Sequence, residues 1–158
     1  MGTKQILPII LLDDDEEDIH IIREVFRELR ICNPLILFRE SSEFFSYLDS
    51  IDPVAGFLNH QYPGLILTDF ALVSDTGLCV LKRLKNHHIY SRFPLIMLAG
   101  SYRQEEIQEA YAHGSNGCFL KPQTLEDYGK LIHMIYMFWI ETLAVPYTGG
   151  LPGMNNRS

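Results

Sequence analysis

Short runs of apolar residues recur along the chain, separated by longer segments in which apolar and polar residues mix. Five runs have the length of strands: 6–12, 35–38, 65–68, 95–98 and 118–120. Runs that are apolar throughout are typical of strands buried on both faces, because helices cover both sides of a parallel sheet. The pattern therefore predicts five strands in one parallel sheet.

The segments between these runs carry apolar residues at spacings of three and four, which predicts amphipathic helices. We expect helices at 16–29, from Ser41 or Ser42 to about Leu48, around 78–85, at 104–113 and at 124–142. Gly114 is the expected left-handed stop of the fourth. The pattern leaves the apolar piece 54–58 undecided between helix and loop. Strands alternating with helices predict an α/β, doubly wound fold with right-handed crossovers.

Composition limits the size and class of the protein. A chain of 158 residues, 47% of them hydrophobic, fits one domain, which we place at 1–145. Residues 146–158 are rich in Gly, Asn and Pro and are expected to form a disordered tail. The formal charge of -7 argues against nucleic-acid binding, and no apolar run reaches the ~18 residues of a membrane span.

The cysteines and histidines suggest no metal site of their own. Cys32, Cys79 and Cys118 form no C-x-x-C pair, so we expect buried thiols in a reducing cytoplasm. The N-terminus has no signal-peptide h-region, which also favours a cytoplasmic location. His87 and His88 are expected to face solvent.

Charged residues follow three of the predicted strands directly. Asp13 and Asp14 come after the first strand, Asp69 after the third and Lys121 after the fifth. The carboxyl ends of parallel strands meet at one edge of the sheet, where ligands bind in open α/β folds. We therefore expect these side chains to form a site at that edge.

The chemistry of such a site follows from its residue types. Clustered carboxylates repel one another and favour a bound cation, and hard oxygen ligands suit Mg²⁺. A carboxylate beside a divalent cation and a lysine can attack a phosphoryl group, because the cations neutralise charge on the transferring oxygens. Phosphoryl transfer to Asp69 is the predicted reaction.

From about 6 to 143, the chain resembles the response-regulator receiver domain of two-component signalling, especially stand-alone members whose first loop reads acid-Asp-x-x-x-Asp. The resemblance implies a flavodoxin-like sheet with strand order 2-1-3-4-5. It also implies Mg²⁺ or Mn²⁺ bound directly by Asp14 and through water by Asp13. Asp69 would be the phosphoacceptor and a further metal ligand, and Ala71 would offer its backbone carbonyl. Lys121 would contact the phosphoryl group, followed by Pro122 in cis.

The chain departs from this family at three positions. Val73 stands where a proline is usual in the loop after the acceptor. Ala99 replaces the usual Ser or Thr at the end of the fourth strand, and Cys118 replaces the usual aromatic switch residue on the fifth. A methyl group cannot donate a hydrogen bond, so a phosphoryl oxygen would depend on backbone N–H groups unless Ser101 substitutes.

The resemblance implies a signalling protein that receives its phosphoryl group from a sensor histidine kinase or a phosphotransfer protein and acts through protein contacts. Beyond its own phosphorylation and dephosphorylation, we expect no enzymatic activity. A homodimer through the helices 104–113 and 124–142 is a further expectation. Two alternatives stay open: a phosphorylation-independent interaction module of the same fold, and a haloacid-dehalogenase-type phosphatase with Asp13 as nucleophile and Asp15 as acid.

Overall fold

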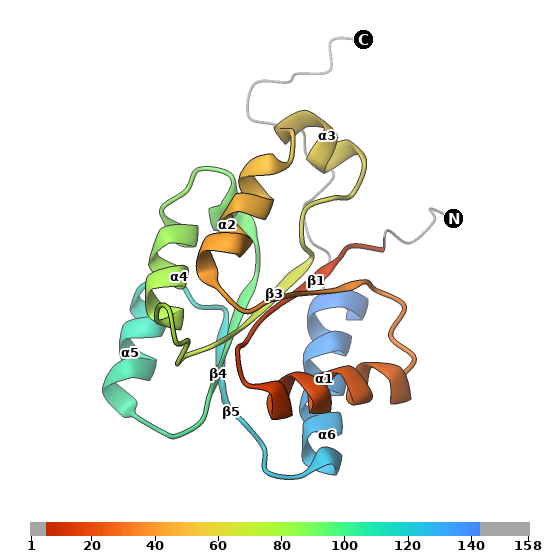
Figure 1. Cartoon of the computed structure of the whole chain (residues 1–158), viewed down its shortest axis with the longest axis vertical. Helices are drawn as coiled ribbons and strands as arrows, with labels where there is room; N and C mark the ends of the chain where they lie inside the picture. The colour runs from red at the N-terminus through yellow and green to blue at the C-terminus, as the bar shows by residue number, and fades with distance from the viewer. Residues whose placement is uncertain (1–5, 143–158) are drawn as a thin grey trace.

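A parallel sheet of five strands forms the centre of the molecule, in the order β2-β1-β3-β4-β5 (Figure 1). The computed structural model describes residues 6–142 of the 158. The strands are β1 (Ile9–Leu12), β2 (Leu35–Phe38), β3 (Leu65–Asp69), β4 (Leu95–Ala99) and β5 (Gly117–Leu120). The fold class and strand order expected from the sequence are therefore confirmed.

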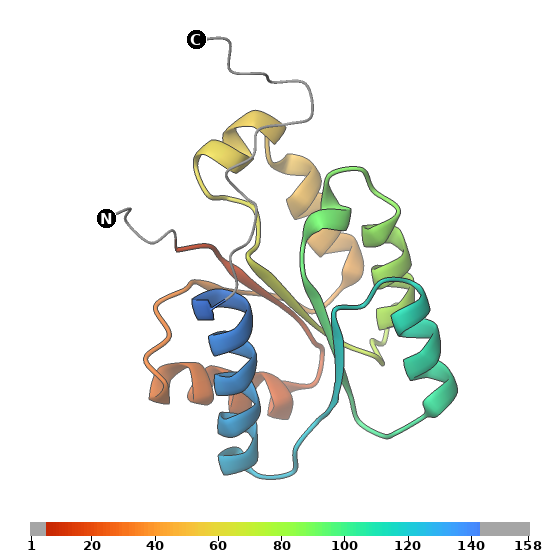
Figure 2. The ribbon, with the colours of Figure 1, turned by 180° about the vertical axis from the view of Figure 1, so that it is seen from behind.

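Helices cover both faces of this sheet. They are α1 (Glu16–Glu28), α2 (Ser41–Ser50), α3 (Pro53–Leu58), α4 (Gly77–Lys85), α5 (Gln104–Ala112) and α6 (Leu125–Tyr136). A 3₁₀ turn, η1 (Tyr90–Arg92), precedes β4, and a π-helical segment, η2 (Met137–Thr142), follows α6. The apolar sides of α1 and α6 pack together on one face (Figure 2), while α2, α4 and α5 enclose the core on the other.

The register of the strands brings their carboxyl ends to one edge. Leu12 of β1 pairs with Thr68 of β3. The next residue along each chain segment is an acid, so the register sets Asp13 beside Asp69. At the other side of β3, Asp69 pairs with Leu98, and the backbone N–H of Lys121 donates to the Ala99 carbonyl oxygen at 2.8 Å. The sheet therefore delivers the charged residues at three strand ends to the same edge.

Some bounds differ from those expected. The first strand begins at Ile9 rather than residue 6, because Pro8 has no N–H to donate to a ladder. The undecided piece 54–58 lies in α3, where Asp52 caps the N-terminus and Pro53 occupies the first turn. The last helix keeps α-helical form only to Tyr136. Gly114 has a φ of 95°, as its role as a helix stop requires. The predicted tail 146–158 lies outside the described residues.

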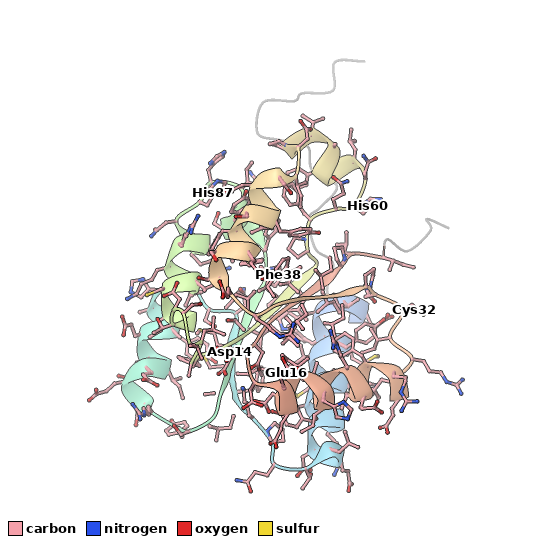
Figure 3. The ribbon with its side chains drawn as sticks, in the orientation of Figure 1. Asp14, Glu16, Cys32, Phe38, His60 and His87 are labelled. Atoms are coloured by element: carbon pink, nitrogen blue, oxygen red, sulfur yellow. The ribbon has the colours of Figure 1, made fainter. Side chains whose placement is uncertain are left out.

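Two expectations about side-chain exposure are wrong. Cys32 and Cys79 are exposed, contrary to expectation, whereas Cys118 is half-buried and packs against the core. Cys32, labelled in Figure 3, lies in the loop between α1 and β2. Cys79 is an exposed residue of α4. His88 is exposed as expected, but His87 is half-buried because its ring stacks on that of Tyr90, with 3.7 Å between ring centroids.

None of the helices within 6–142 has the length and apolar character needed to cross a bilayer.

Candidate functional site

Three carboxylates converge at the carboxyl edge of the sheet. Asp13 and Asp14 stand in the loop between β1 and α1, and Asp69 is the last residue of β3. One oxygen from each lies within 4.8 Å of the others. Asp13 is fully buried and Asp69 is nearly so, whereas Asp14 is half-exposed. The structure thus brings together the three acids that the sequence singled out.

Asp13 is the most deeply placed of these acids. Its Oδ1 accepts a hydrogen bond from the backbone N–H of Asp15 at 3.0 Å, and its Oδ2 lies 3.2 Å from Lys121 Nζ. Burial raises the pKa of Asp13 to about 6, and the hydrogen bonds and the charge of Lys121 oppose that rise only in part. A buried carboxylate of this kind is stabilised in its charged form by a cation nearby.

The loop between β3 and α4 closes over the acids. The backbone N–H of Val73 donates to Asp14 Oδ2 at 2.5 Å. Figure 3 labels Asp14. The backbone N–H of Ala71 donates to Asp69 Oδ1 at 3.1 Å. Gly77 allows the tight return of the chain, since a Cβ there would stand 2.2 Å from the Asp69 carbonyl oxygen. Backbone groups of this loop therefore orient two of the acids.

Lys121 reaches into the middle of the acidic group from the end of β5. Its Nζ donates to Asp69 Oδ2 at 2.9 Å and to Asp18 Oδ2 at 2.6 Å, in addition to Asp13. Burial by itself would lower the pKa of Lys121. The bonds to Asp18 and Asp69 and the charge of Asp13 outweigh that effect and hold the pKa above its ordinary value. The ammonium group is thus fixed in its charged form.

Asp18 and Tyr128 are site residues whose part the sequence reasoning missed. Asp18 lies in the first turn of α1, and the Tyr128 hydroxyl on α6 donates to its Oδ1 at 2.9 Å. Asp18 had one signal, as the third acid of the acid-Asp-x-x-x-Asp loop. Tyr128 had none, because it falls on the apolar face of a helix.

Asp15, the acid of the phosphatase alternative, has another role. Its Oδ1 accepts the backbone N–H groups of Glu17 and Asp18 at 2.8 and 3.2 Å, which makes Asp15 the N-cap of α1. This arrangement gives the phosphatase alternative no support.

A cleft of about 360 Å³ opens beside Asp69. Ala71, Thr76, Ala99 and Ser101 are among the residues that line it. Ala99 is buried and offers only a methyl group, while Ser101 is exposed at the rim. Val73 is 94% exposed, so the loop presents an apolar side chain where the family usually has proline.

Cys118 does not stand alone on β5. Its backbone N–H donates to the Tyr111 hydroxyl at 3.1 Å, and its sulfur lies 3.7 Å from Ser115 Oγ. Burial raises the pKa of the Cys118 thiol. Tyr111, from α5, therefore covers the backbone at the position where the family carries an aromatic residue.

The bond before Pro122 corrects one implication of the resemblance. The peptide bonds of the described residues are all trans, the Lys121–Pro122 bond included, which is the lower-energy isomer.

The donor set fits a hard divalent cation. Asp13, Asp14 and Asp69 contribute carboxylate oxygens, the ligand type that Mg²⁺ and Mn²⁺ prefer, and the buried charge of Asp13 requires compensation. Ala71 lies two residues after Asp69, in the loop that follows β3. This arrangement can hold Asp69, as a nucleophilic carboxylate, between a cation site and Lys121 and beside an open cleft.

Comparison with known proteins agrees with this geometry. Residues 9–133 match the family described as the response regulator receiver domain. The response regulator Rcp1 of Synechocystis sp. (strain ATCC 27184 / PCC 6803 / Kazusa) is 28% identical over 138 residues, which cover 87% of this chain and 92% of Rcp1.

Solved structures show the same fold. The phosphorylated cyanobacterial phytochrome response regulator RcpA is similar with a TM-score of 0.79 at 25% identity, covering 90% of this chain and 99% of RcpA. The Mn²⁺-bound form of Rcp1 has a TM-score of 0.75 at 27% identity, with coverages of 89% and 99%. From the family match, the sheet order and the acidic site together, the chain belongs to the response regulator receiver domains.

Proposed function

We propose that this protein is a phosphoacceptor response regulator that accepts a phosphoryl group on Asp69. The observation that carries the proposal is the position of Asp69 at a strand end, hydrogen-bonded to Lys121 and bordering an open cleft. The donor is a phosphohistidine on a sensor histidine kinase or a phosphotransfer protein. A carboxylate oxygen of Asp69 forms the new O–P bond as the N–P bond breaks, and the donor imidazole leaves with its electron pair.

A divalent cation, Mg²⁺ or Mn²⁺, belongs to this proposal. Asp13, Asp14 and Asp69 would hold it with the backbone carbonyl of Ala71. When bound, the cation neutralises negative charge on the phosphoryl oxygens. The Mn²⁺-bound structure of Rcp1 supports the choice of metal. Lys121 supplies a second positive charge, which its three acidic neighbours keep protonated.

The output of the protein is a change in its protein contacts, and its own chemistry is limited to gaining and losing the phosphoryl group. Exposed apolar side chains on α5 and α6, including Tyr111 and Met134, are available for such contacts. A homodimer through these two helices stays a prediction. The free thiols Cys32, Cys79 and Cys118 suit a reducing compartment such as the cytoplasm.

Incubation with acetyl phosphate and Mg²⁺ tests the proposal directly. We expect the intact protein to gain the mass of one phosphoryl group, and Asp69→Asn to gain none. Asp75→Asn is the matched control, because Asp75 lies in the same loop outside the acidic cluster and its amide can still accept from Thr76. A wild-type protein that stays unmodified, or an Asp69→Asn variant modified equally, would contradict the proposal.

A second candidate is an interaction module of the same fold that works without phosphorylation. Ala99 and Cys118 favour it, because neither side chain can repeat the usual switch between a hydroxyl and an aromatic ring. Partner pull-down with wild type and Asp69→Asn, each before and after phosphorylation, separates the two. Equal recovery of a partner in every sample would favour the second candidate.

A further inference from the structure

We propose that Asp18, held in place by Tyr128, is a positioning residue that keeps the Lys121 ammonium group directed at Asp69. The inference rests on the proposed function, because Lys121 matters to the chemistry only if Asp69 accepts a phosphoryl group. It adds two residues to the site, one from α1 and one from α6.

The contacts of Lys121 show why an anchor is needed. An ammonium group has three N–H donors, and Lys121 directs them to Asp13, Asp18 and Asp69. The bond to Asp18 is the shortest of the three, at 2.6 Å, against 2.9 Å to Asp69 and 3.2 Å to Asp13. The lysine side chain is only 10% exposed, so water cannot replace a lost partner freely.

Two of these partners belong to the reacting centre. Asp13 and Asp69 are members of the candidate metal cluster, and Asp69 would also be modified. Their bonds to Lys121 must therefore change when a cation or a phosphoryl group arrives. Asp18 stands outside that cluster of three and keeps its bond throughout. It gives the flexible four-carbon stem of lysine a fixed point from which Nζ can reach a phosphoryl oxygen.

Tyr128 holds Asp18 in the required orientation. Its hydroxyl donates to Oδ1, which leaves Oδ2 of the same carboxylate facing Lys121. The tyrosine is 1% exposed and packs in the core between α1, α6 and the sheet. Because the tyrosine ring is buried where α1 and α6 pack against each other, the core restricts the movement of this hydroxyl. Burial and the hydrogen bond to Asp18 both raise the pKa of Tyr128, so the hydroxyl remains a donor.

Two substitutions remove these contacts at little cost in volume. Asp18→Asn removes the charge that faces Lys121, and Tyr128→Phe removes only the hydroxyl. Glu17→Gln is the matched control for charge, because Glu17 is the exposed neighbour of Asp18 in the same turn. Tyr136→Phe is the control for the hydroxyl, since Tyr136 is also on α6 and bonds to Glu141. Circular dichroism melting identifies variants that fail to fold.

The first measurement is the ¹H–¹⁵N NMR signal of the Lys121 ammonium group in metal-free protein, assigned by its loss in Lys121→Arg. Hydrogen bonding to three carboxylates should make its hydrogens exchange slowly. We expect the signal to disappear in Asp18→Asn, to weaken in Tyr128→Phe and to persist in both controls. The absence of a protected signal in wild type, or its persistence in a folded Asp18→Asn variant, would overturn the proposal.

The second measurement is the rate of Asp69 phosphorylation by acetyl phosphate at saturating Mg²⁺. Misplacing a charged group by about 1 Å can cost up to about 100-fold, so we expect Asp18→Asn to be roughly tenfold slower and Tyr128→Phe severalfold slower. Unchanged rates in both variants would overturn the positioning role. If wild type is not phosphorylated at all, the proposed function fails, while the NMR result still decides whether Asp18 anchors Lys121.

Discussion

Single residues at the acidic edge show how closely the backbone and the site are fitted together. Gly77 is required by contact distance, because a Cβ would approach the Asp69 carbonyl oxygen to 2.2 Å. The distance that makes glycine necessary exists only in the folded loop, so the sequence alone does not reveal it.

We expect Gly77→Ala to lower the free energy of unfolding by about 1–3 kcal/mol, the range typical of overpacked sites. Urea denaturation monitored by circular dichroism measures the change. Gly100→Ala is the control, since nothing lies within 4 Å of a Cβ built there. If the two substitutions lowered the free energy of unfolding equally, the close contact with the Asp69 carbonyl oxygen would not be destabilising, and the prediction would be wrong.

The buried charge of Asp13 predicts a pH dependence of stability in the absence of metal. Its pKa rises from 3.8 to about 6 on folding, so the folded state binds the proton more tightly. This contribution to stability is full below pH 3.8 and is lost as the pH rises through 6. We expect Asp13→Asn, which resembles the protonated form, to be more stable than wild type at pH 8 in EDTA and to lack this loss. A variant less stable than wild type at pH 8 would contradict the expectation.

The origin of each site residue explains what the sequence could predict. Asp13, Asp14 and Lys121 follow strands, and Asp69 ends one, so strand topology alone places them at one edge. The roles of Asp18 and Tyr128 depend on how α1 packs against α6, a contact between residues 110 positions apart. No local pattern encodes that packing, and a tyrosine among apolar helix residues is indistinguishable from a core residue.

At the scale of elements, helices and central strands were predictable and irregular segments were not. Apolar spacing located α1 and α6 because one face of each is buried. The short α3 depends on a cap by Asp52 and on contacts of Phe57 with the core, and its six residues are too few for a periodic pattern. The change to π-helical form after Tyr136 had no signal in the apolar spacing.

The turn η1 depends on a histidine that the sequence placed in solvent. Nδ1 of His87 accepts the backbone N–H groups of Ile89 and Tyr90, each at 3.2 Å. Burial and the neighbouring His88 lower the pKa of His87, and Asp49 opposes that effect only in part. A protonated Nδ1 could not accept the two backbone bonds. His87 therefore caps the segment that leads into β4.

We expect this cap to weaken in mild acid. The folded pKa of His87 lies below the ordinary value of 6.5, so its contribution to stability is full above pH 6.5 and is lost as the pH falls toward the lowered folded pKa. Urea denaturation between pH 8 and pH 5 should show this loss in wild type and not in His87→Gln. His133→Gln, a change at an exposed histidine on α6, should retain the loss. If the free energy of unfolding changed with pH in the same way in wild type and in His87→Gln, the proposed cap by His87 would be ruled out.

Residues 6–142 form one sheet with a separate helical layer and core on each face, and the acidic site lies where β1, β3 and β5 end. Five apolar runs alternating with helices were enough to predict the α/β class, and the resemblance supplied the strand order. The register, which sets Asp13 beside Asp69, came only from the structure.

Because the site joins three strand ends, a bound cation should stabilise the entire fold. A ligand that binds only the folded state raises the free energy of unfolding by RT ln(1 + [L]/Kd), which is about 2.7 kcal/mol at 100 times Kd. We expect the melting temperature of wild type to rise with Mg²⁺ at pH 8. Asp14→Asn should lose most of that rise, since it removes one acid of the cluster but leaves the oxygen that accepts from Val73. Asp75→Asn should keep the rise, because Asp75 lies outside the cluster; an equal response in all three proteins would place Mg²⁺ elsewhere.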